Sequence, residues 1–173
     1  MKRKIILSIV IILPVIICMA MIFYFSSQDS SRSNSISRDF TSAVAKMLFQ
    51  NFPFMQADVQ STIIYELNLF IRNAAHFFVF FLMSAFIYAE SVIWIRSYFF
   101  SGVISVFLSM IYAVIDEYHQ SFTPGRTPLV KDVFIDTAGA LLGAAACFGI
   151  ISIIFHVKAI MRKNNSSQPF ASL

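Results

Sequence analysis

Four stretches of the chain are apolar over a length that suits a membrane-spanning helix. A helix needs roughly 20 apolar residues to cross the hydrocarbon core of a bilayer. Residues 5–25 and 97–115 contain no charged side chain, whereas 71–95 and 133–157 carry polar residues near their ends. The pattern therefore predicts an all-α fold, a bundle of four transmembrane helices.

The segment between the first two spans has a different pattern. After a serine-rich stretch, two series of apolar residues recur at about every fourth position, the spacing of an amphipathic helix. The first series is Ile36, Phe40, Val44 and Leu48, and the second is Val59, Ile63, Leu67 and Phe70. We expect one or two short helices lying on the membrane surface. The alternative is that they roof a cavity between the spans.

Composition supports a membrane protein, because 58% of the 173 residues are hydrophobic and only 13% are charged. Soluble domains are about 45–50% apolar and about 25% charged, so a disordered chain and an ordinary soluble enzyme are excluded. Cys18 and Cys147 both lie inside apolar runs and form no zinc-type pair. The net charge of +4 is not concentrated in a basic patch, so no nucleic-acid partner is expected.

The distribution of Lys and Arg indicates the topology. If the N-terminus lies inside, the inner segments hold seven basic residues against one acidic residue, and the outer segments hold six against eight. Because basic residues prefer the cytoplasmic side, both termini are predicted to be cytoplasmic. We expect one membrane domain over residues 1–160 and a polar, disordered cytoplasmic tail over 161–173.

Ionisable residues gather at the outer ends of the predicted spans, where they are costly and often functional. Arg72 and His76 are four residues apart and share one face of the second span. Arg72 could instead extend to the interface, as arginine often does. His76 lies one turn deeper, and the alternative to a functional role is a plain hydrogen bond to a neighbouring helix.

The end of the third span places two acids where the helix dipole favours cations. Asp116 and Glu117 should therefore meet Arg72, Arg126 or a bound cation. Gln120 shares a face with Asp116. A Pro-Gly turn then presents Arg126, whose guanidinium suits a carboxylate or a phosphate. The alternative for Arg126 is an internal salt bridge to Asp116, Glu117 or Asp132.

The fourth span begins with two further acids on one face. Asp132 is stabilised by the helix N-terminus, whereas Asp136 lies one turn deeper and needs a partner. We expect that partner to be His76 or Arg72, which lie at a similar depth. Gly139 and Gly143 follow at a spacing that lets another helix approach closely.

These motifs resemble those of the VanZ-like family, small bacterial membrane proteins named for a teicoplanin-resistance accessory protein. The motifs that carry the resemblance are Phe25-Ser26-Ser27-Gln28, Arg72-x-x-x-His76, Asp116-Glu117-x-His119-Gln120-x-Phe122-x-Pro124-Gly125-Arg126 and Asp132-x-x-x-Asp136-x-x-Gly139-x-x-x-Gly143. The resemblance implies four helices in the bacterial cytoplasmic membrane and, for some members, a link to glycopeptide resistance. It supplies no mechanism. One departure is Phe80, where many relatives are expected to carry tyrosine.

Three hypotheses of function follow. The first is a non-enzymatic envelope protein that binds an anionic lipid, a lipid-linked precursor or a lipoglycopeptide in an outward-facing polar pocket. The second is a membrane-embedded enzyme acting on a lipid-linked or phosphorylated envelope substrate. The third, proton-linked transport, is disfavoured because internal repeats are absent from the sequence.

Each of the first two hypotheses assigns its own residues. The binding hypothesis uses Arg72, Gln120, Arg126, Asp132 and Asp136, and the catalytic one uses His76, Asp116, Glu117 and His119. In the enzyme, a divalent cation held by Asp116, Glu117 and Asp136 is conceivable. The sequence identifies neither a cofactor nor a particular metal.

Overall fold

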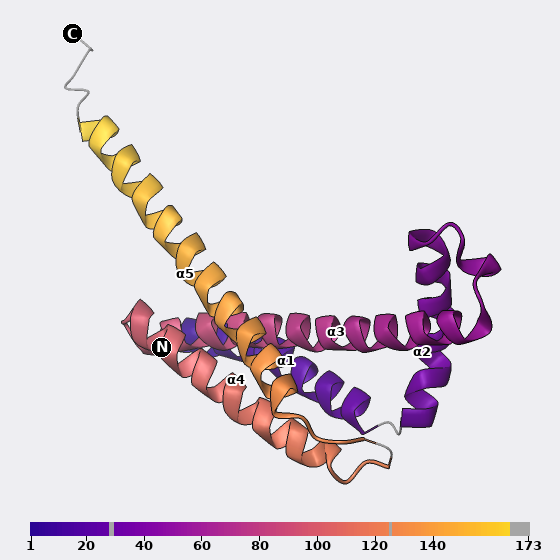
Figure 1. Ribbon diagram of the computed structural model, residues 1–173. Helices are drawn as coiled ribbons and strands as arrows, with labels where there is room; N and C mark the ends of the chain where they lie inside the picture. The colour runs from indigo at the N-terminus through magenta and orange to yellow at the C-terminus, as the bar shows by residue number, and fades with distance from the viewer. Residues whose placement is uncertain (28–29, 125, 167–173) are drawn as a thin grey trace.

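The computed structural model describes residues 1–27, 30–124 and 126–166, and these form helices joined by short loops (Figure 1). The helices are α1 (Lys2–Ser26), α2 (Ser30–Leu48), the short 3-10 helix η1 (Phe52–Phe54), α3 (Ala57–Trp94), α4 (Tyr98–Gln120) and α5 (Val130–Ser166). No strand occurs among the described residues. The predicted all-α fold is confirmed.

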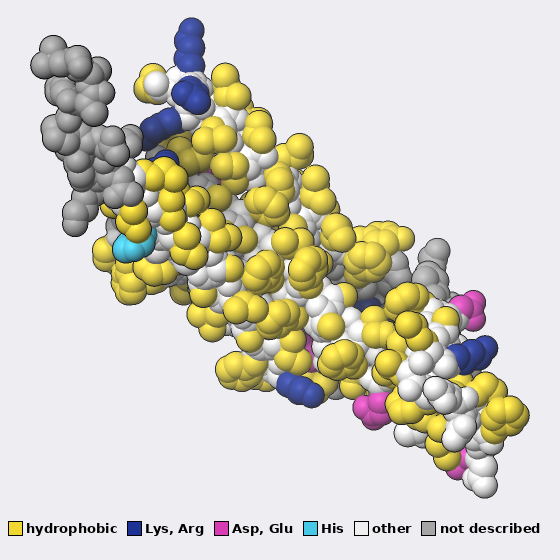
Figure 2. Space-filling model, turned by 90° about the horizontal axis from the view of Figure 1, so that it is seen from above, with side chains coloured by type: hydrophobic (Ala, Val, Ile, Leu, Met, Phe, Trp, Pro, Cys, Tyr) yellow, Lys and Arg dark blue, Asp and Glu magenta, His cyan; other side chains and the backbone are white. Residues whose placement is uncertain are grey.

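Four of these helices, α1, α3, α4 and α5, are long and apolar enough to cross a membrane. They contain the four predicted spans, and the chain is a multi-pass membrane protein. The space-filling view shows apolar side chains along the length of the bundle, with charged side chains mainly toward its two ends (Figure 2). Apolar groups exposed in this way would be costly in water and are the surface that lipid covers.

Two helices run further than the sequence predicted. α3 begins at Ala57, so the stripe from Val59 to Phe70 is the start of α3 and not a separate surface helix. At about 1.5 Å per residue its 38 residues extend about 57 Å, well beyond a hydrocarbon core of about 30 Å. The third membrane span was expected to end at residue 115, and α4 continues beyond it to Gln120, with Asp116 and Gln120 on one face as the sequence predicted.

α3 is the central helix, and it packs against α1, α2, α4 and α5. Its closest neighbour is α5. A Cβ added at Gly139 would overlap the carbonyl oxygen of Phe77, and one added at Gly143 would overlap that of Phe81. The predicted close approach at this glycine pair is therefore present, and it brings the beginning of α5 against the middle of α3.

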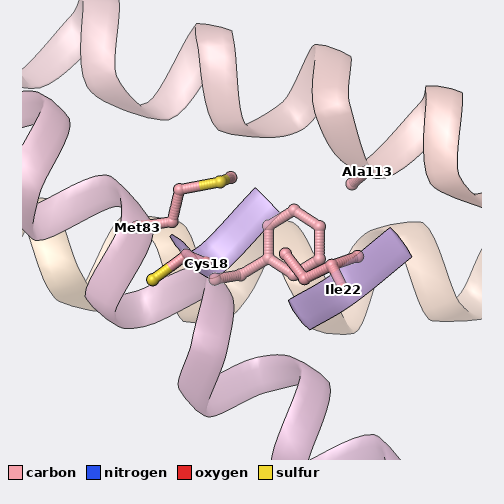
Figure 3. Packing of buried hydrophobic residues seen from close by; sticks show 5 residues of the cluster. Cys18, Ile22, Met83 and Ala113 are labelled. Carbon is pink, nitrogen blue, oxygen red and sulfur yellow. The ribbon is translucent and has the colours of Figure 1, made fainter. Parts of the chain in front are cut away.

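The apolar core lies where α1, α3 and α4 meet (Figure 3). Cys18 and Ile22 from α1 pack with Phe80 and Met83 from α3 and with Ala113 from α4. Phe80 is fully buried in this core, one helical turn from His76. The hydroxyl that a tyrosine would carry at this position is absent here.

α2 crosses α3 at a steep angle beyond the end of α1 (Figure 1). Between residues 39 and 48 of α2, Thr41 and Ala45 are buried, and Phe40 and Leu48 of the predicted stripe remain exposed. An amphipathic helix set across the bundle with an exposed apolar side fits a position on the membrane surface.

The opposite end of the bundle is held by contacts between α1 and α3. The Trp94 indole nitrogen donates to Ser8 Oγ at 3.0 Å and to Glu90 Oε1 at 2.8 Å. Lys4 Nζ donates to the Ile93 carbonyl at 3.0 Å. α5 continues to Ser166, so residues 161–166 are helical where a disordered tail was expected, and 167–173 lie outside the described residues.

Candidate functional site

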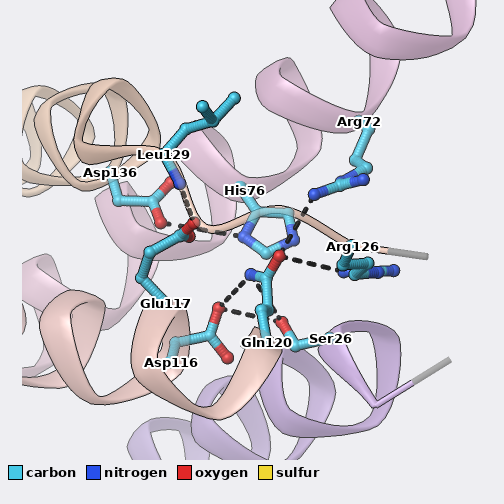
Figure 4. A network of polar contacts seen from close by, with 9 residues as sticks. All are labelled: Ser26, Arg72, His76, Asp116, Glu117, Gln120, Arg126, Leu129 and Asp136. Atoms are coloured by element: carbon cyan, nitrogen blue, oxygen red, sulfur yellow. Dashed lines mark hydrogen bonds and ion pairs between the residues drawn. The ribbon is translucent and has the colours of Figure 1, made fainter. Parts of the chain in front are cut away.

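The buried carboxylates of the described residues lie at the end of the bundle formed by Ser26, Gln120 and Val130, which we call the polar end (Figure 4). All four long helices contribute to it. Asp116, Glu117, Gln120 and Asp136 are each less than 9% exposed. Buried polar groups in a membrane protein must be satisfied internally, and their partners describe the site.

Gln120 lies between the acidic and the basic side chains of the polar end. Its Oε1 accepts hydrogen bonds from Arg72 Nη2 and Arg126 Nη1, both at 3.1 Å. Its Nε2 donates to Asp116 Oδ2 at 2.9 Å and to Ser26 Oγ at 3.3 Å. One neutral amide therefore joins two guanidinium groups on one side to a carboxylate on the other.

Arg126 lies in the loop between α4 and α5 and turns back over the end of α1. Its Nη2 donates to the Phe25 carbonyl at 2.9 Å, so it satisfies one of the last carbonyls of that helix. Its Nε is buried without a partner among the described residues. Burial and the nearby Arg72 lower the pKa of Arg126 to about 10, so the guanidinium is still protonated at neutral pH. The salt bridges considered for Arg126 do not form.

Glu117 has a structural partner. Its Oε1 accepts a short hydrogen bond from the backbone N–H of Leu129, directly before α5 begins at Val130. A carboxylate at this position also faces the positive end of the α5 dipole. Glu117 thereby fixes the start of α5 against the end of α4.

His76 and the two deeper aspartates meet where α3, α4 and α5 converge. His76 Nδ1 lies 3.7 Å from Asp136 Oδ2, and in the described part of the chain no other side-chain nitrogen of His, Lys or Arg lies within 4.0 Å of a carboxylate oxygen. One side-chain donor atom each of His76, Asp116 and Asp136 lies within 4.8 Å of the other two. The partner expected for Asp136 is therefore His76. Glu117, which the sequence grouped with these aspartates, is replaced in this cluster by His76.

A cavity of about 280 Å³ lies beside this network, between α1 and α3. Its wall is mostly apolar, and at the polar end it meets Arg72, His76 and Arg126. The remaining lining residues are Met21, Ile22, Phe25, Asn68, Ile71, Ala75 and Val79. The cavity therefore complements an anionic amphiphile, because cations line one end and apolar side chains line the rest of its wall.

Two predicted site residues lie apart from this network. His119 stacks on Phe23 with ring centroids 4.6 Å apart, and its Nε2 is buried without a partner among the described residues. Asp132 lines a small void beside His76 and Asp136 but makes no ion pair within the described residues.

Ser26 is a member of the network that sequence reasoning did not select as a site residue. Its Oγ donates to Asp116 Oδ2 at 2.8 Å, and its carbonyl accepts from Thr123 Oγ1 at 3.4 Å. The available signal was that Ser26 is the first polar residue after the long apolar run of the first span. That position does not reveal that α1 ends beside α4.

Comparison with known proteins adds one finding. A family model described as VanZ/LLP1 matches residues 11–155, which include α3, α4 and most of α1 and α5. No curated protein and no solved structure matches the chain.

Proposed function

The chain belongs to the VanZ/LLP1 family, and we propose that it is an envelope protein whose polar end binds an anionic amphiphile. The phosphate or carboxylate head would contact Arg72 and Arg126. The hydrocarbon tail would lie in the cavity between α1 and α3. The occupant is then an anionic lipid, a lipid-linked precursor or a lipoglycopeptide.

The observation that carries this proposal is the cavity itself. A pocket of about 280 Å³ with apolar walls and two guanidinium groups at one end matches a ligand with a charged head and an apolar tail. In the described residues neither guanidinium is neutralised by a carboxylate within 4.0 Å. Each gives one N–H to Gln120, which leaves further donors for an anion.

We propose further that the polar end faces the outside of the bacterial cytoplasmic membrane. This orientation puts the seven basic residues of the inner segments on the cytoplasmic side. It also lays α2 on the outer surface, next to the mouth of the cavity. The head group would then come from the outer leaflet.

The direct test is lipid binding by the purified full-length chain in detergent. Native mass spectrometry would compare phosphatidylglycerol with phosphatidylcholine of the same acyl chains. We expect preferential retention of phosphatidylglycerol, reduced about tenfold by Arg72→Gln and by Arg126→Gln, because each removes a charge-assisted hydrogen bond of about 1.5–3 kcal/mol.

Lys131→Gln is the matched control, since Lys131 is an exposed cation at the same end that does not line the cavity. It should leave retention unchanged. Equal retention of the two lipids by the native chain would contradict the proposal. An equal loss of phosphatidylglycerol retention in the Lys131 variant would mean that any surface cation attracts the lipid and that the cavity is not required.

Teicoplanin is a more specific candidate occupant, because it carries a lipid tail that vancomycin lacks. Expression in a Gram-positive host should then raise the inhibitory concentration of teicoplanin and leave that of vancomycin unchanged. The Arg72→Gln variant, confirmed in the membrane, should lose this effect. No change for teicoplanin with the native chain would remove the antibiotic from the set of occupants.

A second candidate function is an enzyme acting on the same kind of amphiphile. It is favoured by the position of His76, which lines the cavity and has Asp136 beside its Nδ1. A histidine with an acid behind it is a common general base. If it acts in this way, His76→Gln should abolish turnover of a phosphorylated lipid while lipid retention persists.

A further inference from the structure

Two buried aspartates and one partly buried histidine, from three helices, converge below the Gln120 network. His76 comes from α3, Asp116 from α4 and Asp136 from α5, and the exposed fractions of the two aspartates are 4% each. One donor atom of each lies within 4.8 Å of the other two (Figure 4). From this convergence we infer that His76, Asp116 and Asp136 bind one divalent transition-metal ion.

The separations are somewhat longer than those of a formed site. Zinc lies about 2.0–2.2 Å from nitrogen and oxygen ligands, so two ligands of a tetrahedral ion are about 3.3–3.6 Å apart. The three donor atoms lie within 4.8 Å of one another. They would have to approach by up to about 1.5 Å to reach the tetrahedral separation, through rotation of the side chains.

The charges at this position also favour a bound cation. Asp116 accepts hydrogen bonds from Ser26 and Gln120 through a single oxygen, Oδ2. Asp136 Oδ2 lies 3.7 Å from His76 Nδ1, which is longer than a hydrogen bond. In the described residues no Lys or Arg lies within 4.0 Å of either carboxylate. A buried carboxylate without a cation is costly, and a bound metal ion would offset that cost.

A void next to two of the three side chains, His76 and Asp136, is a second observation. A small space of about 10 Å³ is lined by His76 and Asp136, together with Arg72, Asn73, Gln120, Asp132 and Ile135. Such a space has room for about one water-sized particle. Close packing would have removed it if the two side chains merely filled the interior.

The donor set indicates the class of ion. Carboxylates alone favour Mg²⁺ or Ca²⁺, whereas imidazole nitrogen suits zinc and other transition metals. Three protein ligands leave a position open, as in catalytic zinc sites. His76 also borders the larger cavity, so the ion would lie next to the head-group position of the proposed amphiphile. The metal is nevertheless a separate ligand and can be tested without any lipid added.

The experiment is a calorimetric titration of Zn²⁺ into the purified, chelator-stripped full-length chain in detergent. We expect one ion per chain, with affinity at least tenfold lower for His76→Gln, Asp116→Asn and Asp136→Asn. The matched controls are His119→Gln and His156→Gln, which change the other two histidines of the chain. These controls should bind like the native chain.

A measurement on the unmodified chain covers the case in which a variant fails to fold. Co²⁺ in place of Zn²⁺ should give the visible absorption of a site with nitrogen and oxygen ligands, and one equivalent of Zn²⁺ should remove it. Absence of stoichiometric Zn²⁺ binding, or equal loss in the His119 or His156 variant, would overturn the inference. Because no lipid is present, neither result bears on the binding of the amphiphile.

Discussion

Gln120 determines how charge is arranged at the polar end. Two arginines and a buried aspartate would pair directly in the absence of an intermediary, and such pairing would use up the cations. The amide accepts from both guanidinium groups and donates to Asp116, so charges of opposite sign lie near one another without forming ion pairs. Arg72 and Arg126 consequently keep donors for a ligand.

Removing this amide should destabilise the bundle. Gln120→Ala removes one hydrogen-bond partner each from Arg72, Arg126 and Asp116. Each buried donor or acceptor left unsatisfied costs about 1–3 kcal/mol. We expect a lower unfolding midpoint in detergent, measured by circular dichroism. Gln50→Ala changes an exposed glutamine and is the matched control. An unfolding midpoint for Gln120→Ala equal to that of the native chain would show that the network adds nothing to stability.

The sequence identified most members of the site and few of their pairings. Arg72, His76, Asp116, Gln120, Arg126 and Asp136 stand out because polar residues near a membrane span are costly. Their partners depend on how α1 and the loop after α4 are placed, which local spacing does not encode. For that reason the sequence offered an internal salt bridge only as one alternative for Arg126, and did not indicate its observed partners, Gln120 and the Phe25 carbonyl.

At the scale of elements, the pairing of α3 with α5 sets the depth of the metal-binding cluster. The two glycines of α5 meet backbone carbonyls of α3, so the helices approach as closely as their main chains allow. His76 lies directly before Phe77, the contact of Gly139. Close approach at this point is what brings Asp136 near His76.

A single added methyl group should disturb this pairing. In Gly139→Ala the Cβ would overlap the Phe77 carbonyl, so α5 must shift away from α3. Strain of this kind typically costs about 1–3 kcal/mol, and we expect a lower unfolding midpoint together with weaker Zn²⁺ binding. Gly149→Ala, where an added Cβ meets nothing within 4 Å, should match the native chain in both measurements. Equal effects of the two substitutions would contradict the role of the helix contact.

The helices themselves were predictable because long apolar runs leave few alternatives in a membrane. The residues at which the helices begin and end were less predictable. α4 runs past Asp116 because Ser26 and Gln120 satisfy that carboxylate, and no rule based on apolar run length includes such partners. Likewise, nothing between Phe70 and Ile71 breaks the helix, so the second amphipathic stripe and the span form one element.

At the scale of the molecule, the two ends of the bundle are chemically different. The polar end holds the network, the cavity mouth and the crossing helix α2. The other end holds Lys4 and Trp94 in a compact contact between α1 and α3. Basic residues at this end anchor it on the cytoplasmic side under the topology we propose.

Cysteine accessibility in intact cells tests this topology. In a chain with Cys18 and Cys147 replaced by alanine, Lys46→Cys should react with a membrane-impermeant maleimide, because α2 would lie outside. Lys2→Cys should react only after the cells are opened. The reverse labelling pattern would show that the topology is the opposite one and that the polar end faces the cytoplasm.

The central claim is that an anionic amphiphile lies between α1 and α3 at the polar end, and one fluorescence measurement tests it most directly. Trp94, the single tryptophan, lies at the other end of the bundle. With Trp94→Phe as background, Phe25→Trp places a reporter in the cavity wall. Vesicles would contain phosphatidylglycerol or phosphatidylcholine with identical brominated chains.

We predict stronger quenching of the Phe25→Trp reporter by the brominated phosphatidylglycerol, and loss of this preference on Arg72→Gln. Trp94 in the otherwise native chain should show no such dependence on the Arg72 substitution. Equal quenching of the cavity reporter by the two lipids would contradict the account, because it would mean that the cavity selects no anionic head group.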